Sequence, residues 1–129
     1  MPGAKASRGG RRKVTAPRVR PARVYLAGPM SGYPRWNYDA FEAATAKLRS
    51  LGLDVTSPHE IDLGLGFDPD TDPETFTQAD WHKAMRRDIA EVLKVDGVVV
   101  LPGWEDSAGA QVEVTVARAL GIPVEEFRP

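Results

Sequence analysis

VVVLPGWEDSAGAQVEVTVARAL, residues 98–120, is the stretch that decides the fold of this chain. It begins with a continuous apolar run that ends at Pro102 and Gly103, which is the pattern of a strand buried on both faces. A turn follows, and then a helix is predicted to begin near residues 107–109 and to stop at Gly121. The stretch therefore predicts a buried strand, a turn and a helix in succession.

The predicted helix carries a carboxylate on its apolar side. At about 100° per residue, one side is polar and carries Gln111, Thr115 and Arg118. The opposite side is apolar, and Glu113 projects among its residues: Val116, Ala117 and Leu120. Burying a carboxylate costs several kcal/mol unless it is paired or hydrogen-bonded. Glu113 is therefore the first candidate for a functional residue.

Length and composition set the class of protein. The 129 residues are 42% hydrophobic, which is enough for one small domain with a single core. There is no cysteine, so neither disulfides nor thiolate metal sites are expected. No run approaches the roughly 18 apolar residues of a membrane span, and no apolar segment marks a secretory signal. We expect a cytoplasmic protein that makes no membrane contact.

The charge is distributed unevenly along the chain. Residues 1–23 hold 8 of the 17 lysines and arginines and no acid, whereas residues 24–129 carry 9 basic and 18 acidic side chains, a net charge of −9. The basic segment is poor in large apolar residues and is predicted to be disordered. It is a solvated tail, a weak non-specific nucleic-acid arm, or a contact with another domain or subunit. The acidic remainder, residues 24–129, is predicted to be the folded domain.

A glycine-bearing turn follows the first predicted strand. VYLAG at residues 24–28 is a short apolar strand, and GPMSG at residues 28–32 follows it directly. In an open α/β sheet, the ligand crevice lies beyond the carboxyl ends of the strands. The turn therefore suits an anion or a sugar hydroxyl, although it lacks the spacing of the common phosphate-binding fingerprints and can equally be a plain turn.

The middle of the chain alternates helix, strand and loop. A helix is predicted over residues 38–50 with Asn37 or Asp39 as its cap, and a strand over residues 53–57. His59 and Glu60 are expected in the following loop. Residues 62–77 are rich in Gly, Pro and Asp and are predicted to be a flap over the site or an inert insertion. Their acids do not match the spacing of a calcium-binding EF-hand loop.

A second misplaced carboxylate occurs in the helix predicted over residues 78–94. Its apolar side is formed by Trp81, Met85, Ile89 and Val92, and its polar side by Lys83, Arg87, Glu91 and Lys94. Asp88 projects at the edge of the apolar side, where it is either functional or bonded to a neighbouring loop. His82 is expected to be a surface or packing residue because no second His or Cys accompanies it. A short last strand is predicted at residues 122–124, with residues 125–129 as a tail.

Strands that alternate with helices imply parallel pairing through right-handed crossovers. We therefore predict an α/β fold, a small doubly wound sheet of four parallel strands in the order 2-1-3-4, of flavodoxin or Rossmann type. The switch point would lie between the first and third strands, so the glycine turn, Ser107 and Glu113 would converge on one crevice. The start of a helix at Ser107 can offer a hydroxyl and free N–H groups to a phosphate.

Two carboxylates on buried faces beside an anion site favour cleavage of a glycosidic bond. One carboxylate attacks or stabilises an oxocarbenium-like carbon, and the other orients the sugar or moves a proton. The alternative for both Glu113 and Asp88 is a structural carboxylate that pairs with an arginine or caps backbone N–H groups. No metal and no cofactor are expected from the residues present.

The motifs together resemble a known family. Residues 24–32 (VYLAGPMSG), Arg87-Asp88, Asp96 before an apolar strand, and residues 107–113 (SAGAQVE) are similar to the nucleoside 2-deoxyribosyltransferase superfamily. The branch it resembles most is the small DUF4406-type proteins common in phages and bacteria, and the similarity extends to the deoxynucleoside 5′-monophosphate N-glycosidases. It covers nearly all of residues 23–124.

The resemblance implies a role for each matching residue. It implies that Glu113 is a nucleophile that forms a covalent deoxyribosyl intermediate, that Asp88 contacts the sugar and assists catalysis, and that Ser107 binds the 5′-phosphate. Gly109 of the same motif is expected in the substrate-binding site. The loop along the sugar and phosphate would consist of Gly28, Pro29, Met30, Ser31 and Gly32, with Tyr25 as the aromatic residue of the first strand. It also implies a flavodoxin-like fold and a homo-oligomer, a dimer or larger, in which a neighbouring subunit often completes the site.

The sequence thus predicts an enzyme that cleaves the N-glycosidic bond of a deoxynucleoside or its 5′-monophosphate, by hydrolysis or by transfer to a second base. Ser107 at a helix start favours a nucleotide and hydrolysis. Trp36 and Trp104 are candidates for stacking on the base, or else packing residues. The alternatives are a non-catalytic nucleotide-binding or sensing module, and a DNA-associated accessory protein that acts through residues 1–23.

Overall fold

A computed structural model describes residues 21–129 of the chain. Most of the predicted basic tail, residues 1–20, lies outside the described residues, so its predicted disorder and contacts stay predictions. Arg23, the last residue of the predicted tail, belongs to the first strand. Its backbone N–H donates to the Asp96 carboxylate at 2.8 Å, which ties the beginning of the sheet to the segment before the third strand.

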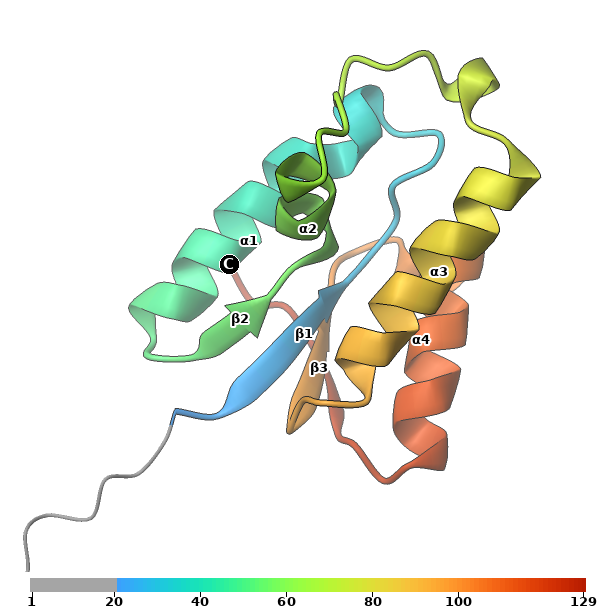
Figure 1. Ribbon diagram of the computed structural model, residues 1–129. Helices are drawn as coiled ribbons and strands as arrows, with labels where there is room; N and C mark the ends of the chain where they lie inside the picture. Colours follow the sequence, from blue (N-terminus) through green and yellow to red (C-terminus); the bar gives the residue numbers. More distant parts are fainter. Residues whose placement is uncertain (1–20) are drawn as a thin grey trace, which may run out of the picture.

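Four parallel strands form the sheet in the order 2-1-3-4, as predicted (Figure 1). In chain order they are β1 (Arg23–Ala27), β2 (Asp54–Thr56), β3 (Gly97–Val100) and β4 (Val124–Glu126). Because β1 and β3 lie side by side in the centre, the loops that leave their carboxyl ends emerge next to each other.

Four α-helices and three short 3₁₀ segments connect the strands. The helices are α1 (Tyr38–Ser50), α2 (Pro58–Gly64), α3 (Gln78–Val92) and α4 (Ala108–Ala119). The 3₁₀ segments are η1 (Pro34–Asn37), η2 (Pro73–Thr75) and η3 (Trp104–Asp106). None of the helices within residues 21–129 has the length and apolar character needed to cross a membrane.

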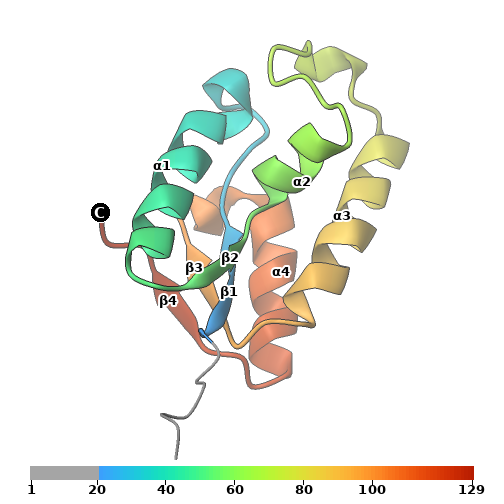
Figure 2. The ribbon, with the colours of Figure 1, turned by 60° about the vertical axis from the view of Figure 1, so that its left-hand side comes forward.

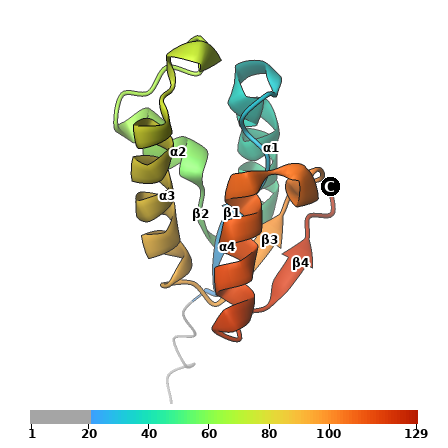
Figure 3. The same ribbon diagram turned by 90° about the vertical axis from the view of Figure 1, so that its right-hand side faces the viewer.

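The two faces of the sheet are covered by different helices (Figures 2 and 3). Successive side chains of a strand point to opposite faces, so Val24 and Leu26 pack with α1, whereas Tyr25 and Ala27 pack with α4. Helix α3 lies beside α4 on the second face. This alternation directs the Tyr25 side chain, which is fully buried, towards α4.

The structure differs from the sequence predictions at helix α2, at the last strand and at the end of helix α4. Residues 58–64 form helix α2 rather than loop, because Pro58 suits the first position of a helix and its ring is buried together with His59. The last strand is Val124–Glu126 rather than residues 122–124. An edge strand tolerates exposed glutamates, and Glu125 and Glu126 gave this segment the hydrophilic sequence of a tail. Leu120, predicted on the apolar side of its helix, is exposed at the helix end.

Candidate active site

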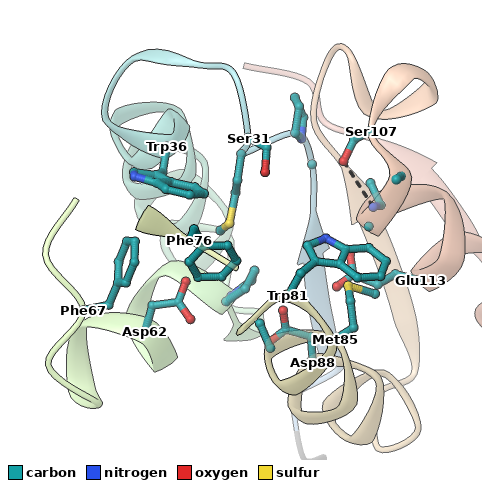
Figure 4. Close-up of a pocket in the computed structure, with 18 of the residues that line it drawn as sticks. Ser31, Trp36, Asp62, Phe67, Phe76, Trp81, Met85, Asp88, Ser107 and Glu113 are labelled. Carbon is teal, nitrogen blue, oxygen red and sulfur yellow. Dashed lines mark hydrogen bonds between the residues drawn. The ribbon is translucent and has the colours of Figure 1, made fainter. Parts of the chain in front are cut away.

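A cavity of about 530 Å³ opens at the carboxyl end of the sheet, between the loop after β1, helix α2 with the segment that follows it, and helices α3 and α4 (Figure 4). The predicted site residues that line this cavity are Gly28, Pro29, Met30, Ser31, Asp88, Ser107, Gly109 and Glu113. Tyr25 lies beneath the cavity and reaches it through Glu113, and Gly32 does not line it. The topology therefore brings residues from four parts of the chain to one place.

Glu113 reaches the cavity from the buried face of α4 and is only 5% exposed. The Tyr25 hydroxyl donates a hydrogen bond to Glu113 Oε2 at 2.7 Å, which leaves Oε1 free of protein partners among the described residues. Burial raises the pKa of Glu113 to about 8, the Tyr25 hydrogen bond opposes this rise, and the negative charge of Asp88 adds to it. The same burial and the neighbouring carboxylates raise the pKa of Tyr25 well above its ordinary value, so Tyr25 stays a neutral donor.

Asp88 reaches the cavity from α3 and is 8% exposed. Its Oδ1 atom is buried and has no hydrogen-bond partner in the described part of the chain. Burial, followed by the charge of Asp62, raises the pKa of Asp88 to about 7, whereas Arg87 lowers it. Asp88 and Glu113 thus approach the same cavity from two neighbouring helices (Figure 4), and each holds its proton more tightly than a carboxyl in water.

Asp62 is a further carboxylate at the cavity, and the sequence interpretation missed it. Its Oδ2 accepts a hydrogen bond from the Tyr38 hydroxyl at 2.8 Å, and its Oδ1 accepts one from Arg87 Nη2 at 2.7 Å. Arg87 was predicted to face water, but it is half-buried and turned towards α2. The only sequence signal was the helix start at Pro58, which would have placed Asp62 on an ordered element.

Ser107 caps helix α4 at the rim of the cavity. Its Oγ accepts a hydrogen bond from the Ala110 N–H at 3.3 Å, drawn as a dashed line in Figure 4, so its own hydroxyl proton remains available to a ligand. Gly109 packs closely on α3, because a Cβ there would lie 3.2 Å from Met85 Sδ. The close contact holds the first turn of α4 beside the α3 residues of the site.

The loop after β1 passes very close to β3. A Cβ on Gly28 would lie 2.8 Å from the Leu101 Cβ, so only glycine fits at this crossing. Asn37 was predicted, as an alternative to Asp39, to cap α1, but its side chain makes no capping hydrogen bond. Its Nδ2 donates instead to the Pro29 carbonyl at 2.9 Å. The glycine loop is therefore fixed from both sides.

Residues 65–77 form a flap that is held by Trp36. The Trp36 ring meets Phe67 and Phe76 edge-on, with centroids 5.4 Å and 5.2 Å apart, and its Nε1 donates to the Thr71 carbonyl at 3.3 Å. The segment lines the cavity through Leu65, Gly66, Phe67 and Phe76, which favours the flap prediction over the inert insertion. Trp36 also lines the cavity and is mostly buried.

Of the other two tryptophans, Trp104 takes the predicted packing alternative and Trp81 lines the cavity. Trp104 does not line the cavity; it packs against the core under α4, and the Arg118 guanidinium lies 5.7 Å from the centre of its ring. Trp81, assigned to the apolar side of its helix, lines the cavity from α3 (Figure 4). Trp81 is therefore a further aromatic side chain at the cavity.

Neither histidine belongs to the cavity. His59 is buried in α2 rather than lying in a loop, with its Nδ1 2.5 Å from Ser57 Oγ, and burial lowers its pKa. His82 lies exposed on α3, 3.1 Å from the Gln78 side chain. Within residues 21–129, no group of three His, Cys, Asp or Glu side chains has the geometry to hold a metal ion.

Comparison with known proteins finds both a matching family and similar solved structures. A family model described as "Domain of unknown function (DUF4406)" matches residues 22–126. A solved 2-deoxyribosyltransferase from the psychrotolerant bacterium Bacillus psychrosaccharolyticus is similar, with a TM-score of 0.59 and 24% identity over 81% of this chain and 71% of that one. At this identity the likeness establishes the shared fold. The comparison with curated proteins finds no match.

Proposed function

The chain belongs to the DUF4406 family, and from this premise we propose that it cleaves the N-glycosidic bond of a deoxynucleoside or its 5′-monophosphate through Glu113. One observation carries the proposal: a buried glutamate faces the cavity with one oxygen held by Tyr25 and the other free, next to a second buried carboxyl. The fold shared with a 2-deoxyribosyltransferase supports it.

In the first step, Glu113 Oε1 attacks C1′ of the sugar. A C1′–O bond forms as the C1′–N bond breaks, and the electron pair of that bond leaves with the base, which takes up a proton. The Tyr25 hydroxyl holds Oε2 and favours the ionised carboxylate that the attack requires. Asp88, protonated below about pH 7, contacts the sugar or supplies the proton.

In the second step, water or a free base attacks C1′ and releases Glu113. Two displacements at one carbon retain the configuration of the sugar. The loop after β1 and Ser107 both line the cavity, and the free N–H groups at the first turn of α4 suit the phosphate of a 5′-monophosphate. Trp81 and the aromatic flap provide apolar surface for the base.

The decisive experiment is a substrate panel. The four deoxynucleosides and their 5′-monophosphates are incubated with the protein, with and without a free acceptor base, and the released and exchanged bases are measured by chromatography. We expect base release by the wild-type protein and a loss of about 10³-fold or more for Glu113→Gln. Glu42→Gln, an exposed glutamate on α1, serves as the matched control and should keep wild-type activity.

The panel also separates the alternatives. Base release that Glu113→Gln leaves unchanged would reject the nucleophile assignment. Binding of a nucleotide without release of base, measured by calorimetry, would instead establish the non-catalytic binding module. Exchange of base only in the presence of an acceptor would identify a transferase, and release without acceptor a hydrolase.

A further inference from the structure

Asp62 is a carboxylate at the cavity for which the proposed reaction has no use. It lies in α2, 25 residues before Arg87 in sequence, and its side chain is 17% exposed. Both of its oxygens are occupied by protein groups, Oδ1 by Arg87 Nη2 and Oδ2 by the Tyr38 hydroxyl. Asp62 is therefore held in place by protein groups, and it can act on the site through its charge and through Arg87.

Arg87 lies between two carboxylates and bonds to only one of them. Its Nη2 donates to Asp62 at 2.7 Å, whereas its Nε stops 3.8 Å from Asp88 Oδ1. Both Arg87 Nε and Asp88 Oδ1 are buried, and neither has a hydrogen-bond partner among the described residues. A guanidinium beside a carboxylate ordinarily closes to a two-pronged pair at about 2.7–2.9 Å. Leaving these two atoms unpaired costs free energy. The hydrogen bond to Asp62 holds the Arg87 guanidinium on the side of α2.

We propose that Asp62 is a positioning residue for Asp88: it holds the Arg87 guanidinium and thereby leaves Asp88 Oδ1 open to accept a hydrogen bond from the substrate. The inference rests on the proposed function, because that function gives Asp88 its contact with the sugar. Without the Asp62 carboxylate, Arg87 has one buried anion within reach, and it closes on Asp88. The resulting ion pair occupies the oxygen that the substrate needs.

Several charged groups and two tyrosine hydroxyls surround Asp88, and the test must separate their effects. They are Asp62 from α2, Arg87 and Glu91 from α3, Glu113 from α4, and the hydroxyls of Tyr25 from β1 and Tyr38 from α1. Replacing Asp62 by Asn removes one negative neighbour, which alone lowers the pKa of Asp88. Movement of Arg87 lowers that pKa further. The second effect requires Arg87, and the first does not.

The experiment is a titration of the Asp88 carboxyl by carbon-13 NMR in the substrate-free protein. It compares wild type with Asp62→Asn, Arg87→Met and the double variant; Met keeps the apolar stem of Arg87 in place. We expect Asp62→Asn to lower the Asp88 midpoint by about 1–3 pH units when Arg87 is present. In the Arg87→Met background the same substitution should move the midpoint by less than half as much. Equal movements in the two backgrounds would overturn the proposal.

Tyr38→Phe is the matched control. It removes the partner of Asp62 Oδ2 but keeps the Asp62 charge and its bond to Arg87, so the Asp88 midpoint should stay near that of the wild type. If Asp62→Asn does not fold, Asp62→Ser, which also removes the charge but shortens the side chain, provides the same comparison. A midpoint that moves as far in Tyr38→Phe as in Asp62→Asn would show that α2 acts on Asp88 without the ion pair.

Activity gives an independent readout. We expect kcat/KM of Asp62→Asn to fall about tenfold or more and to recover in the double variant, because removing Arg87 frees Asp88 again. A residue that only supports the fold would not be rescued by a second substitution. The titration needs no substrate, so it tests the positioning role of Asp62 independently of the proposed function. If the protein releases no base from any nucleoside or nucleotide, the proposed function is refuted, and the NMR result still decides whether Asp62 holds Arg87 away from Asp88.

Discussion

Tyr25 connects the first strand of the sheet to the carboxylate on its fourth helix. Its side chain is fully buried, and its hydroxyl bonds to Glu113 across 88 residues of sequence. A donor to a carboxylate oxygen stabilises the ionised form, which the proposed attack on C1′ requires. The strand thus supplies both a core aromatic ring and one polar contact of the site.

Tyr25→Phe should move the pH dependence of the reaction. Without the hydroxyl, the pKa of Glu113 rises above about 8, because the hydrogen bond that opposed the effect of burial is gone. The rising limb of kcat/KM against pH should therefore shift to higher pH, with a loss of about tenfold at pH 7. The profile is measured between pH 5.5 and 9.5, with Tyr33→Phe, a half-exposed tyrosine, as the control whose limb should not move. A Tyr25→Phe limb at the wild-type position would contradict the role of the bond.

At this scale the sequence predicts residues on one helix face better than contacts between elements. Glu113 and Asp88 were found because a helical projection locates a charge on an apolar side without knowledge of the fold. Arg87 was assigned to water by the same projection, since its partner Asp62 lies on α2, whose position depends on the path of the whole middle segment. A projection contains no information about a second element.

The segment η1 contains the most strained backbone near the site. Arg35, Trp36 and Asn37 all have positive φ angles, 51°, 56° and 61°, which cost L-amino acids about 1–2 kcal/mol each. Three contacts hold the segment: Arg35 with Asp70, Trp36 with the flap, and Asn37 with the Pro29 carbonyl. The strain is compensated by contacts that join the flap to the glycine loop.

Arg35 offers a direct measurement of this strain. Arg35→Ala and Arg35→Gly lose the same exposed ion pair with Asp70, but only glycine adopts a positive φ angle without steric cost. We expect the glycine variant to be more stable than the alanine variant by about 1 kcal/mol, the reverse of the usual order in helices. Urea unfolding of the two variants gives the difference. Equal stabilities, or a more stable alanine variant, would mean that the backbone relaxes out of the left-handed region.

Elements with a regular hydrophobic pattern were predicted well, and the short ones were not. Helix α1 has the predicted bounds, because Phe41, Ala44 and Leu48 recur on one face and are buried. Helix α2 has seven residues and no such repeat, so Gly and Asp around it made it resemble a loop. The left-handed turn at residues 35–37 was not predicted, since none of the three residues is glycine.

At the scale of the whole molecule, the alternation of strands and helices was sufficient to predict the parallel sheet and its order. Right-handed crossovers leave few arrangements for four strands, and the central pair β1 and β3 then defines where the cavity opens. The oligomeric state and the contacts of residues 1–20 depend on surfaces that a single-chain pattern does not encode, and they stay predictions.

The raised pKa values of Glu113 and Asp88 also predict how stability depends on pH, and the raised pKa of Asp62 acts in the same direction. In the folded state Glu113 and Asp88 hold their protons to about pH 8 and 7, whereas in the unfolded chain they release them near their ordinary values of 4.5 and 3.8. The folded state therefore binds more protons across this range, and the free energy of unfolding must fall as pH rises. His59, whose pKa is lowered, acts in the opposite direction only below about pH 6.5, its ordinary value.

The window from pH 6.5 to 8 lies above the range in which His59 contributes, and it contains the titration of Glu113 and Asp88. We expect the free energy of unfolding, from urea titrations, to fall by about 2 kcal/mol across it in the wild type. Glu113→Gln should lose more than half of that dependence and be the more stable protein at pH 8, because a neutral amide replaces a buried charge and its Oε1 still accepts the Tyr25 hydrogen bond. Glu42→Gln should retain the wild-type dependence. The deprotonation that readies Glu113 for attack thus weakens the fold, and a wild-type stability that stays constant from pH 6.5 to 8 would contradict the raised pKa values of Glu113 and Asp88.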